Sequence, residues 1–196
     1  PTNFYFSVDE RELKPSDLFS KFDIVDEEGT HFNALEAGAV TLDKTTPKEI
    51  FDAEGKPYCV TEVNAYFTDP TKADAEPVAA PVNPTVYIGV KGDADLNGIV
   101  DVPDGVSILT YTAKVAAGQA DVAFNEDENL NKLAFFLADV DTESKDGMNN
   151  GNKLMTPQDA VNVLTYTAKS AAGQEPTWPD VIPSLKSLEG SIWYEG

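Results

Sequence analysis

An internal repeat in the second half of this chain most constrains how it folds. Residues 104–119 match residues 159–174 at an offset of 55, and 12 of the 16 positions are identical. In both copies an acidic residue near the start, apolar residues at three- and four-residue spacing, and a final glycine predict a helix. Residues 129–136, between the copies, are apolar enough for a connecting helix. Because the unit occurs only twice, it predicts a pseudo-symmetric helix pair and not a solenoid.

Oxygen-bearing side chains precede the first copy at the spacing of a calcium loop. Over residues 93–104 they stand at loop positions 1, 3, 5, 9 and 12, with Gly98 at position 6 and Ile99 offering its backbone carbonyl at position 7. Alternate residues of such a loop point inward, and glycine allows the sharp turn. Calcium is a hard cation that prefers six to eight oxygen ligands. The predicted ligands of a first calcium ion are therefore Asp93, Asp95, Asn97, Ile99, Asp101 and Asp104.

The loop before the second copy is longer and less regular. It spans 21 residues from Asp139 to Asp159, and residues 143–151 form an insertion that can bulge out cheaply, because closure entropy grows slowly with loop length. Either the loop ends meet and Asp139 is the first ligand, or Asp146 replaces it. A second calcium ion is expected here, with predicted ligands Asp139, Asp141, Asn152, Leu154, Thr156 and Asp159.

The first 91 residues are rich in short, partly alternating runs of strand-forming residues. These runs cover residues 4–8, 22–25, 39–42, 58–63 and 85–90, with turn signals between several of them. We expect two domains: an N-terminal all-β immunoglobulin-like sandwich over 1–91, then a small all-α unit with two calcium loop–helix repeats over 92–175. Residues 176–196 form a C-terminal tail with three aromatic side chains, which either clasp the first module or the start of the chain or remain free: Trp178, Trp193 and Tyr194.

Charge and motif content exclude several functional classes. The chain has 14 basic and 34 acidic residues, a net charge of −20, which disfavours binding to nucleic acid or anionic membranes. No apolar run approaches the roughly 18 residues of a membrane span. A nucleophile elbow, a phosphate loop and zinc-ligand spacing are all absent from the sequence, so we predict no catalytic residues and no enzyme activity. The single Cys59 excludes an internal disulfide but not an extracellular location.

Two loop–helix calcium units related by an internal repeat resemble a dockerin, the module that attaches cellulosomal enzymes and scaffoldins to cohesin domains. The β-rich segment that continues without a linker into Asp93 resembles an X module. The whole is similar to the X module–dockerin pair of a scaffoldin from rumen-type bacterial cellulosomes. This resemblance implies a secreted, extracellular and cell-surface-associated protein of polysaccharide catabolism. It also implies one-to-one binding to a cohesin, with the X module stabilising the dockerin.

Each predicted helix carries two apolar stripes. One contains Val106 and Leu109 in the first copy, and the other contains Val115. One stripe packs on the other helix, and the second is either internal as well or faces the cohesin. By resemblance, dockerins recognise cohesins through residues that match Val102, Pro103, Leu109, Thr110 and Lys114 and, in the second copy, Pro157, Gln158, Leu164, Thr165 and Lys169. The predicted partner-binding set adds four residues of the other stripe: Ile108, Tyr111, Val163 and Tyr166.

Two other functions fit parts of the sequence. An EF-hand-like calcium sensor or buffer is one alternative, although position 12 is Asp in both loops instead of the bidentate Glu of sensor EF-hands. A carbohydrate-binding β-sandwich with an attached dockerin is the other. Its sugar platform would consist of Tyr5, Tyr58, Tyr66 and Phe67.

Overall fold

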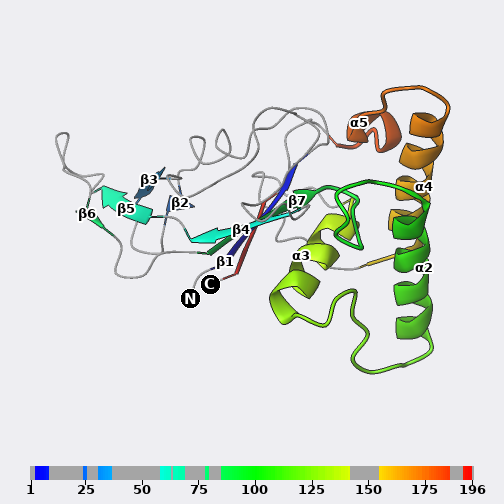
Figure 1. Cartoon of the computed structure of the whole chain (residues 1–196), viewed down its shortest axis with the longest axis horizontal. Coiled ribbons are helices and arrows are strands. Elements are labelled where there is room, and N and C mark those ends of the chain that lie inside the picture. The colour runs from blue at the N-terminus through cyan, green and yellow to red at the C-terminus, as the bar shows by residue number, and fades with distance from the viewer. Residues whose placement is uncertain are drawn as a thin grey trace.

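The computed structural model describes residues 3–8, 24–25, 31–36, 58–62, 64–68, 78–79, 85–141, 155–185 and 192–195 of the chain. Helices and strands follow one another as β1 (Asn3–Val8), β2 (Ile24–Val25), β3 (His31–Glu36), β4 (Cys59–Glu62), β5 (Asn64–Thr68), β6 (Val78–Ala79), β7 (Thr85–Val90), α2 (Val102–Ala116), α3 (Glu128–Ala138), α4 (Pro157–Ala171), α5 (Trp178–Val181) and β8 (Ile192–Glu195). The sheet formed by β2, β3, β5 and β6 lies at one end of the molecule, and helices α2 and α4 lie at the other (Figure 1).

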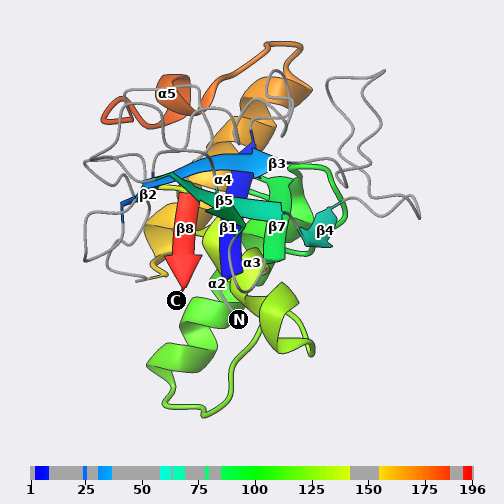
Figure 2. The same ribbon diagram turned by 90° about the vertical axis from the view of Figure 1, so that its left-hand side faces the viewer.

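The strands form two sheets of four. Their orders are β4-β7-β1-β8 and β2-β3-β5-β6. Strand β1 runs parallel to β7, with Tyr5 opposite Tyr87, and antiparallel to β8, with Tyr5 opposite Trp193 (Figure 2). The last described strand of the chain therefore pairs with the first. The domain boundaries at residues 91 and 175 stay predictions.

The prediction of an immunoglobulin-like all-β sandwich is wrong. Such a sandwich packs two sheets face to face. In the described part of the chain helical residues outnumber strand residues. Among the described elements outside its own sheet, helix α3 is the one that packs on the β1–β7 pair. The rings of Tyr5 and Tyr87 stack at 5.0 Å and share one buried cluster with Leu133 and Leu137 of α3. An apolar helix face thus covers this sheet, and the predicted strand over 39–42 lies outside the described residues.

Helix α3 approaches strand β7 closely because the strand has a glycine at the contact. A Cβ on Gly89 would lie 2.5 Å from Leu137 Cδ1, so only glycine leaves room for this side chain. Leu137 and the following Ala138 are fully buried. This contact fixes the end of α3, and with it the position of Asp139, which follows directly.

The two predicted helices of the repeat are confirmed as α2 and α4. Each has a proline in its first turn and begins with a capping box. The side chain of the third helical residue accepts a hydrogen bond from the backbone N–H of the residue before the helix. Gly118 and Gly173 end them in the left-handed region, at φ 71° and 77°. The connecting helix is also confirmed, as α3. None of the described helices is long and apolar enough to cross a membrane.

Candidate metal centres

Three aspartates from the two ends of the first loop meet in front of helix α2. Carboxylate oxygens of Asp93, Asp95 and Asp104 all lie within 4.8 Å of one another. Asp93 and Asp104 are buried, whereas Asp95 is exposed. Carboxylates gathered in this way are the ligands that hard divalent cations prefer.

Backbone N–H groups of the loop hold the two buried carboxylates in place. Asp93 accepts hydrogen bonds from the N–H groups of Asn97 and Gly98, at 3.0 and 2.7 Å. Asp104 accepts from the N–H of Ala94 at 2.8 Å through Oδ1, and from that of Asp101 at 2.8 Å through Oδ2. The left-handed backbone of Leu96 and Gly98 turns the chain, at φ 61° and 85°. The loop therefore winds around its own acidic side chains.

The other predicted ligands of the first site lie on the same loop. Asn97 Oδ1 accepts a hydrogen bond from the N–H of Ile99 at 2.8 Å, and the Ile99 side chain is 58% exposed. The Oδ1 atom of Asp101 is buried and has no hydrogen-bond partner within the described structure. A buried, unpaired carboxylate oxygen is costly unless a cation or water satisfies it. The donor set thus fits a divalent metal ion.

Burial makes the charged form of these aspartates unfavourable in the metal-free chain. It raises the pKa of Asp93 to about 8 and that of Asp104 to about 7, against the lowering effect of the backbone hydrogen bonds. The negative charge of Asp95 raises both further. A cation among the three carboxylates would offset both the burial and the repulsion.

A second cluster repeats this arrangement in front of helix α4. Carboxylate oxygens of Asp139, Asp141 and Asp159 lie within 4.8 Å of one another, and Asp139 and Asp159 are buried. Asp159 Oδ1 accepts from the N–H of Val140 at 3.1 Å, and Oδ2 accepts from the N–H of Thr156 at 2.8 Å. Burial again raises the pKa of Asp159. Both clusters could hold a metal ion.

The backbone hydrogen bonds around Asp159 match those around Asp104 one for one. The N–H groups that Asp159 accepts come from Val140, Asp141 and Thr156, at the positions that correspond to Ala94, Asp95 and Asp101 around Asp104. Thr156 differs from Asp101 in donating its hydroxyl to Asp159 Oδ2 as well, at 3.1 Å. The predicted ligands Asn152 and Leu154, and the alternative first ligand Asp146, lie outside the described residues.

No protein-family model and no curated protein matches this chain. The two centres are therefore inferred from their geometry and from the repeat.

The structure separates the predicted partner-binding residues into exposed and buried ones. Ile108 and Val163 have no exposed surface and Tyr166 is 2% exposed, so these three belong to the core and do not face a partner. Tyr111 is half-buried, and its ring stacks on Phe124 at 4.7 Å. This stripe is thus internal at these four residues, whereas Val115, further along the same stripe of α2, is 50% exposed. The exposed members are Val102, Pro103, Leu109, Thr110, Lys114, Pro157, Gln158 and Thr165, and Leu164 and Lys169 are half-buried.

Three further apolar side chains, outside the predicted partner-binding set, are also exposed. Val106 and Val161, which occupy matched positions of the repeat, are 52% and 51% exposed, and Ile99 is 58% exposed. The sequence carried a signal for both valines, because they share the stripe of Leu109 and Leu164. We define the exposed apolar face as the exposed residues Ile99, Val102, Val106, Leu109 and Val161 together with the half-buried Leu164.

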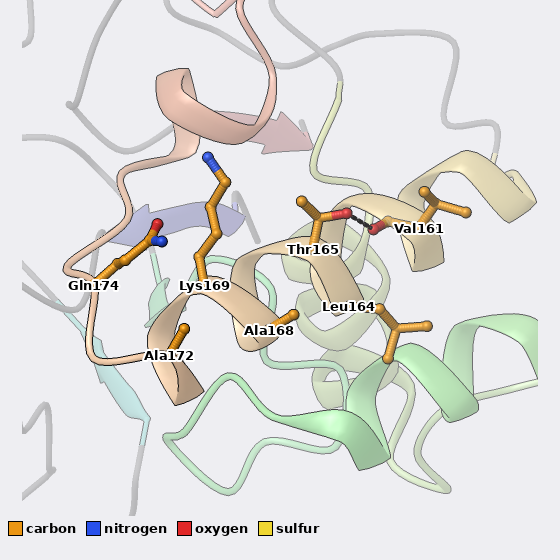
Figure 3. Close-up of a pocket in the computed structure, with 7 residues that line it drawn as sticks. All are labelled: Val161, Leu164, Thr165, Ala168, Lys169, Ala172 and Gln174. Atoms are coloured by element: carbon orange, nitrogen blue, oxygen red, sulfur yellow. Dashed lines mark hydrogen bonds between the residues drawn. The ribbon is translucent and has the colours of Figure 1, made fainter.

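Part of this face forms an open pocket along helix α4 (Figure 3). Val161, Leu164 and Ala168 line it, together with Thr165, whose hydroxyl donates to the Val161 carbonyl at 2.7 Å. Lys169 lines it too, but its Nζ donates to the Asp180 carbonyl of α5 at 3.1 Å. Helix α5 therefore holds one of the two matched lysines of the repeat.

Proposed function

We propose that this chain is a non-catalytic, calcium-dependent protein–protein interaction module. Its two acidic clusters bind one calcium ion each, and the exposed apolar face of α2 and α4 binds a cohesin domain, one to one. The N-terminal part, which resembles an X module, stabilises the helical part. The module attaches a cellulosome component to a scaffold at the cell surface, outside the cell.

The duplicated acidic cluster is the observation that carries the proposal. A single cluster of aspartates is common on an acidic surface, but here the same hydrogen-bond pattern around a buried carboxylate occurs twice, before two copies of the same helix. Asp93, Asp95 and Asp104 would hold one ion, and the second cluster would hold the other. Calcium would supply the positive charge that buried carboxylates need.

The position of the clusters connects metal binding to the docking face. Asp104 and Asp159 are the third residues of α2 and α4, so the groups that bind the ion also form the first turn of each helix. Val102, Val106 and Val161 lie in the first two turns and are at least half exposed. An ordered loop therefore fixes the part of each helix that carries the apolar face.

Calorimetric titration against a panel of cohesins, in calcium and then in chelator, tests the proposal. We expect one-to-one binding to a cohesin in calcium and none in chelator. The test variant is the double substitution Asp104→Asn and Asp159→Asn, which removes one charge from each cluster. Its control is Glu126→Gln, which removes an exposed charge outside both clusters. Calcium uptake without cohesin binding would instead favour a sensor or buffer. Absence of calcium uptake would exclude the proposal altogether.

A further inference from the structure

A tryptophan from the C-terminal part of the chain lies against the residue that opens the first acidic loop. Gly92 precedes Asp93 and has a left-handed backbone, at φ 96°. A Cβ at this position would lie 2.6 Å from Trp178 Cζ2 and 3.0 Å from Val100 Cγ1. Val100 belongs to the same loop and is buried. The glycine therefore lets the indole ring lie directly on the backbone where the first loop begins.

The same indole ring contacts the helix that follows the second loop. Trp178 stacks on Tyr166 of α4, with ring centroids 4.6 Å apart and an interplanar angle of 19°. Both side chains are almost fully buried, at 3% and 2% exposure. Tyr166 lies two turns beyond Asp159 of the second cluster, on a helix that Asp159 caps.

The turn of α5 fixes this tryptophan. Thr177 and Asp180 cap it reciprocally, with the Thr177 hydroxyl donating to Asp180 Oδ2 at 2.6 Å. Lys169 of α4 donates to the Asp180 carbonyl, which ties α5 to the helix that Trp178 contacts. Residues just before and just after Trp178 are thus held by hydrogen bonds, and these bonds fix the position of the indole ring.

A backbone hydrogen bond links the starts of the two loops as well. The N–H of Gly92 donates to the Leu137 carbonyl at 2.8 Å. Asp93 follows the donor directly, and Asp139 lies two residues beyond the acceptor. Gly92 therefore contacts the first loop through Val100, the last turn of α3 just before Asp139, and the indole ring that stacks on α4.

We propose that Trp178 couples the two metal sites, so that filling one raises the calcium affinity of the other. The inference rests on the proposed calcium binding by both clusters. When calcium orders the first loop, it fixes Gly92 and Val100, and the indole ring that lies on them is then held against Tyr166. When calcium orders the second loop, it fixes α4, and the ring that stacks on Tyr166 is then held against Gly92. Whichever site fills first has already ordered the tryptophan for the other. Couplings of this kind are typically about 5- to 150-fold in affinity.

Calcium titration of the full chain by calorimetry tests the coupling. Asp104→Asn disables the first site, and we expect it to lower the affinity of the remaining second site at least about fivefold. In the Trp178→Ala background the same substitution should leave the second site unchanged. Trp178→Phe, which retains an aromatic ring, should restore part of the coupling. Trp193→Phe is the matched control, since this other tryptophan pairs with Tyr5 in the sheet and should leave the coupling intact.

Fluorescence gives a readout that a purely structural role would not produce. In a Trp193→Phe chain Trp178 is the only tryptophan, and calcium binding to the second site alone, in an Asp104→Asn variant, should change its emission. Tyr166→Leu keeps an apolar side chain but removes the ring contact, and it should abolish both the emission change and the coupling. This variant also serves if Trp178→Ala does not fold.

Two results would overturn the inference: independent filling of the two sites in the unmodified chain, or an undiminished coupling in Trp178→Ala or Tyr166→Leu. A chain that binds no calcium at all would instead overturn the proposed function, so the two failures are distinguishable.

Discussion

The side chain of Leu164 lies directly over Gly105, so helices α2 and α4 meet at a point where one of them has no side chain. A Cβ on Gly105 would lie 2.6 Å from both Cδ2 and Cγ of Leu164. The matched residue of the second copy is Ala160, which is fully buried. The pair of helices is therefore pseudo-symmetric in sequence but not in packing.

We expect Gly105→Ala to destabilise the helix pair, although it makes the two copies more alike. The added methyl overlaps Leu164 at a cost of about 1–3 kcal/mol, which exceeds the gain of about 1 kcal/mol in helix propensity. Thermal or urea unfolding of the calcium-loaded protein measures the difference. In a Leu164→Ala background the overlap is gone, and Gly105→Ala should then be neutral or stabilising. A single variant as stable as the unmodified protein would contradict the close packing of Leu164 on Gly105.

Removing one carboxylate should weaken the site to which it belongs. We expect Asp159→Asn to lower the calcium affinity of the second site about tenfold or more, because a buried ligand loses its charge while the backbone donors around it remain. Direct calcium titration measures this. Glu126→Gln, an exposed change of the same kind, should leave both affinities unaltered.

Calcium binding should release protons near neutral pH. The pKa values of Asp93 and Asp104 in the folded, metal-free chain, about 8 and about 7, lie well above the 3.8 of the free carboxyl. Between the free pKa of 3.8 and these raised values, the two carboxyl groups hold more protons in the folded chain than in the unfolded one. Their contribution to the free energy of unfolding therefore falls as pH rises from about 4 to about 8. Calcium must displace these protons, and its affinity should therefore rise over the same interval.

Calorimetry at pH 7 in two buffers of different ionisation enthalpy detects the released protons. Unfolding of the metal-free protein at pH 5.5 and pH 8 tests the stability trend separately. Equal binding heats in both buffers would contradict the raised pKa values.

The exposed apolar face should respond to substitutions in both helices. We expect Val106→Ser and Val161→Ser each to weaken cohesin binding about fivefold, because each side chain is half exposed in the free protein and would be buried in the complex. Val60→Ser is the matched control: Val60 is 39% exposed but lies on strand β4, at the edge of the first sheet. If the control weakens binding equally, the docking face lies elsewhere.

The features that could be predicted from the sequence are those set by neighbouring residues. The spacing of oxygen-bearing residues over 93–104 predicts a loop that gathers its own acids, because the donors and acceptors lie within a dozen residues. Asp104 and Asp159, in the first turns, mark where the two helices begin. Gly118 and Gly173, after the last turns, mark where they end, and both signals are local. The repeat extends this reading from the first copy to the second despite the inserted loop.

The features that the sequence left open depend on contacts between distant segments. Periodicity gives each helix two apolar stripes. Only the packing of α2 against α4, and of Tyr111 against Phe135 of α3, decides that Ile108 is buried and Val106 is exposed. Short strands alone are compatible with an immunoglobulin-like sandwich, but in the structure α3 covers the first sheet, and β8 near the C-terminus pairs with β1. Hydrophobic burial is not directional, so a strand pattern cannot say which apolar surface will cover it. Tertiary structure decided this, and it also placed Trp178 against Gly92.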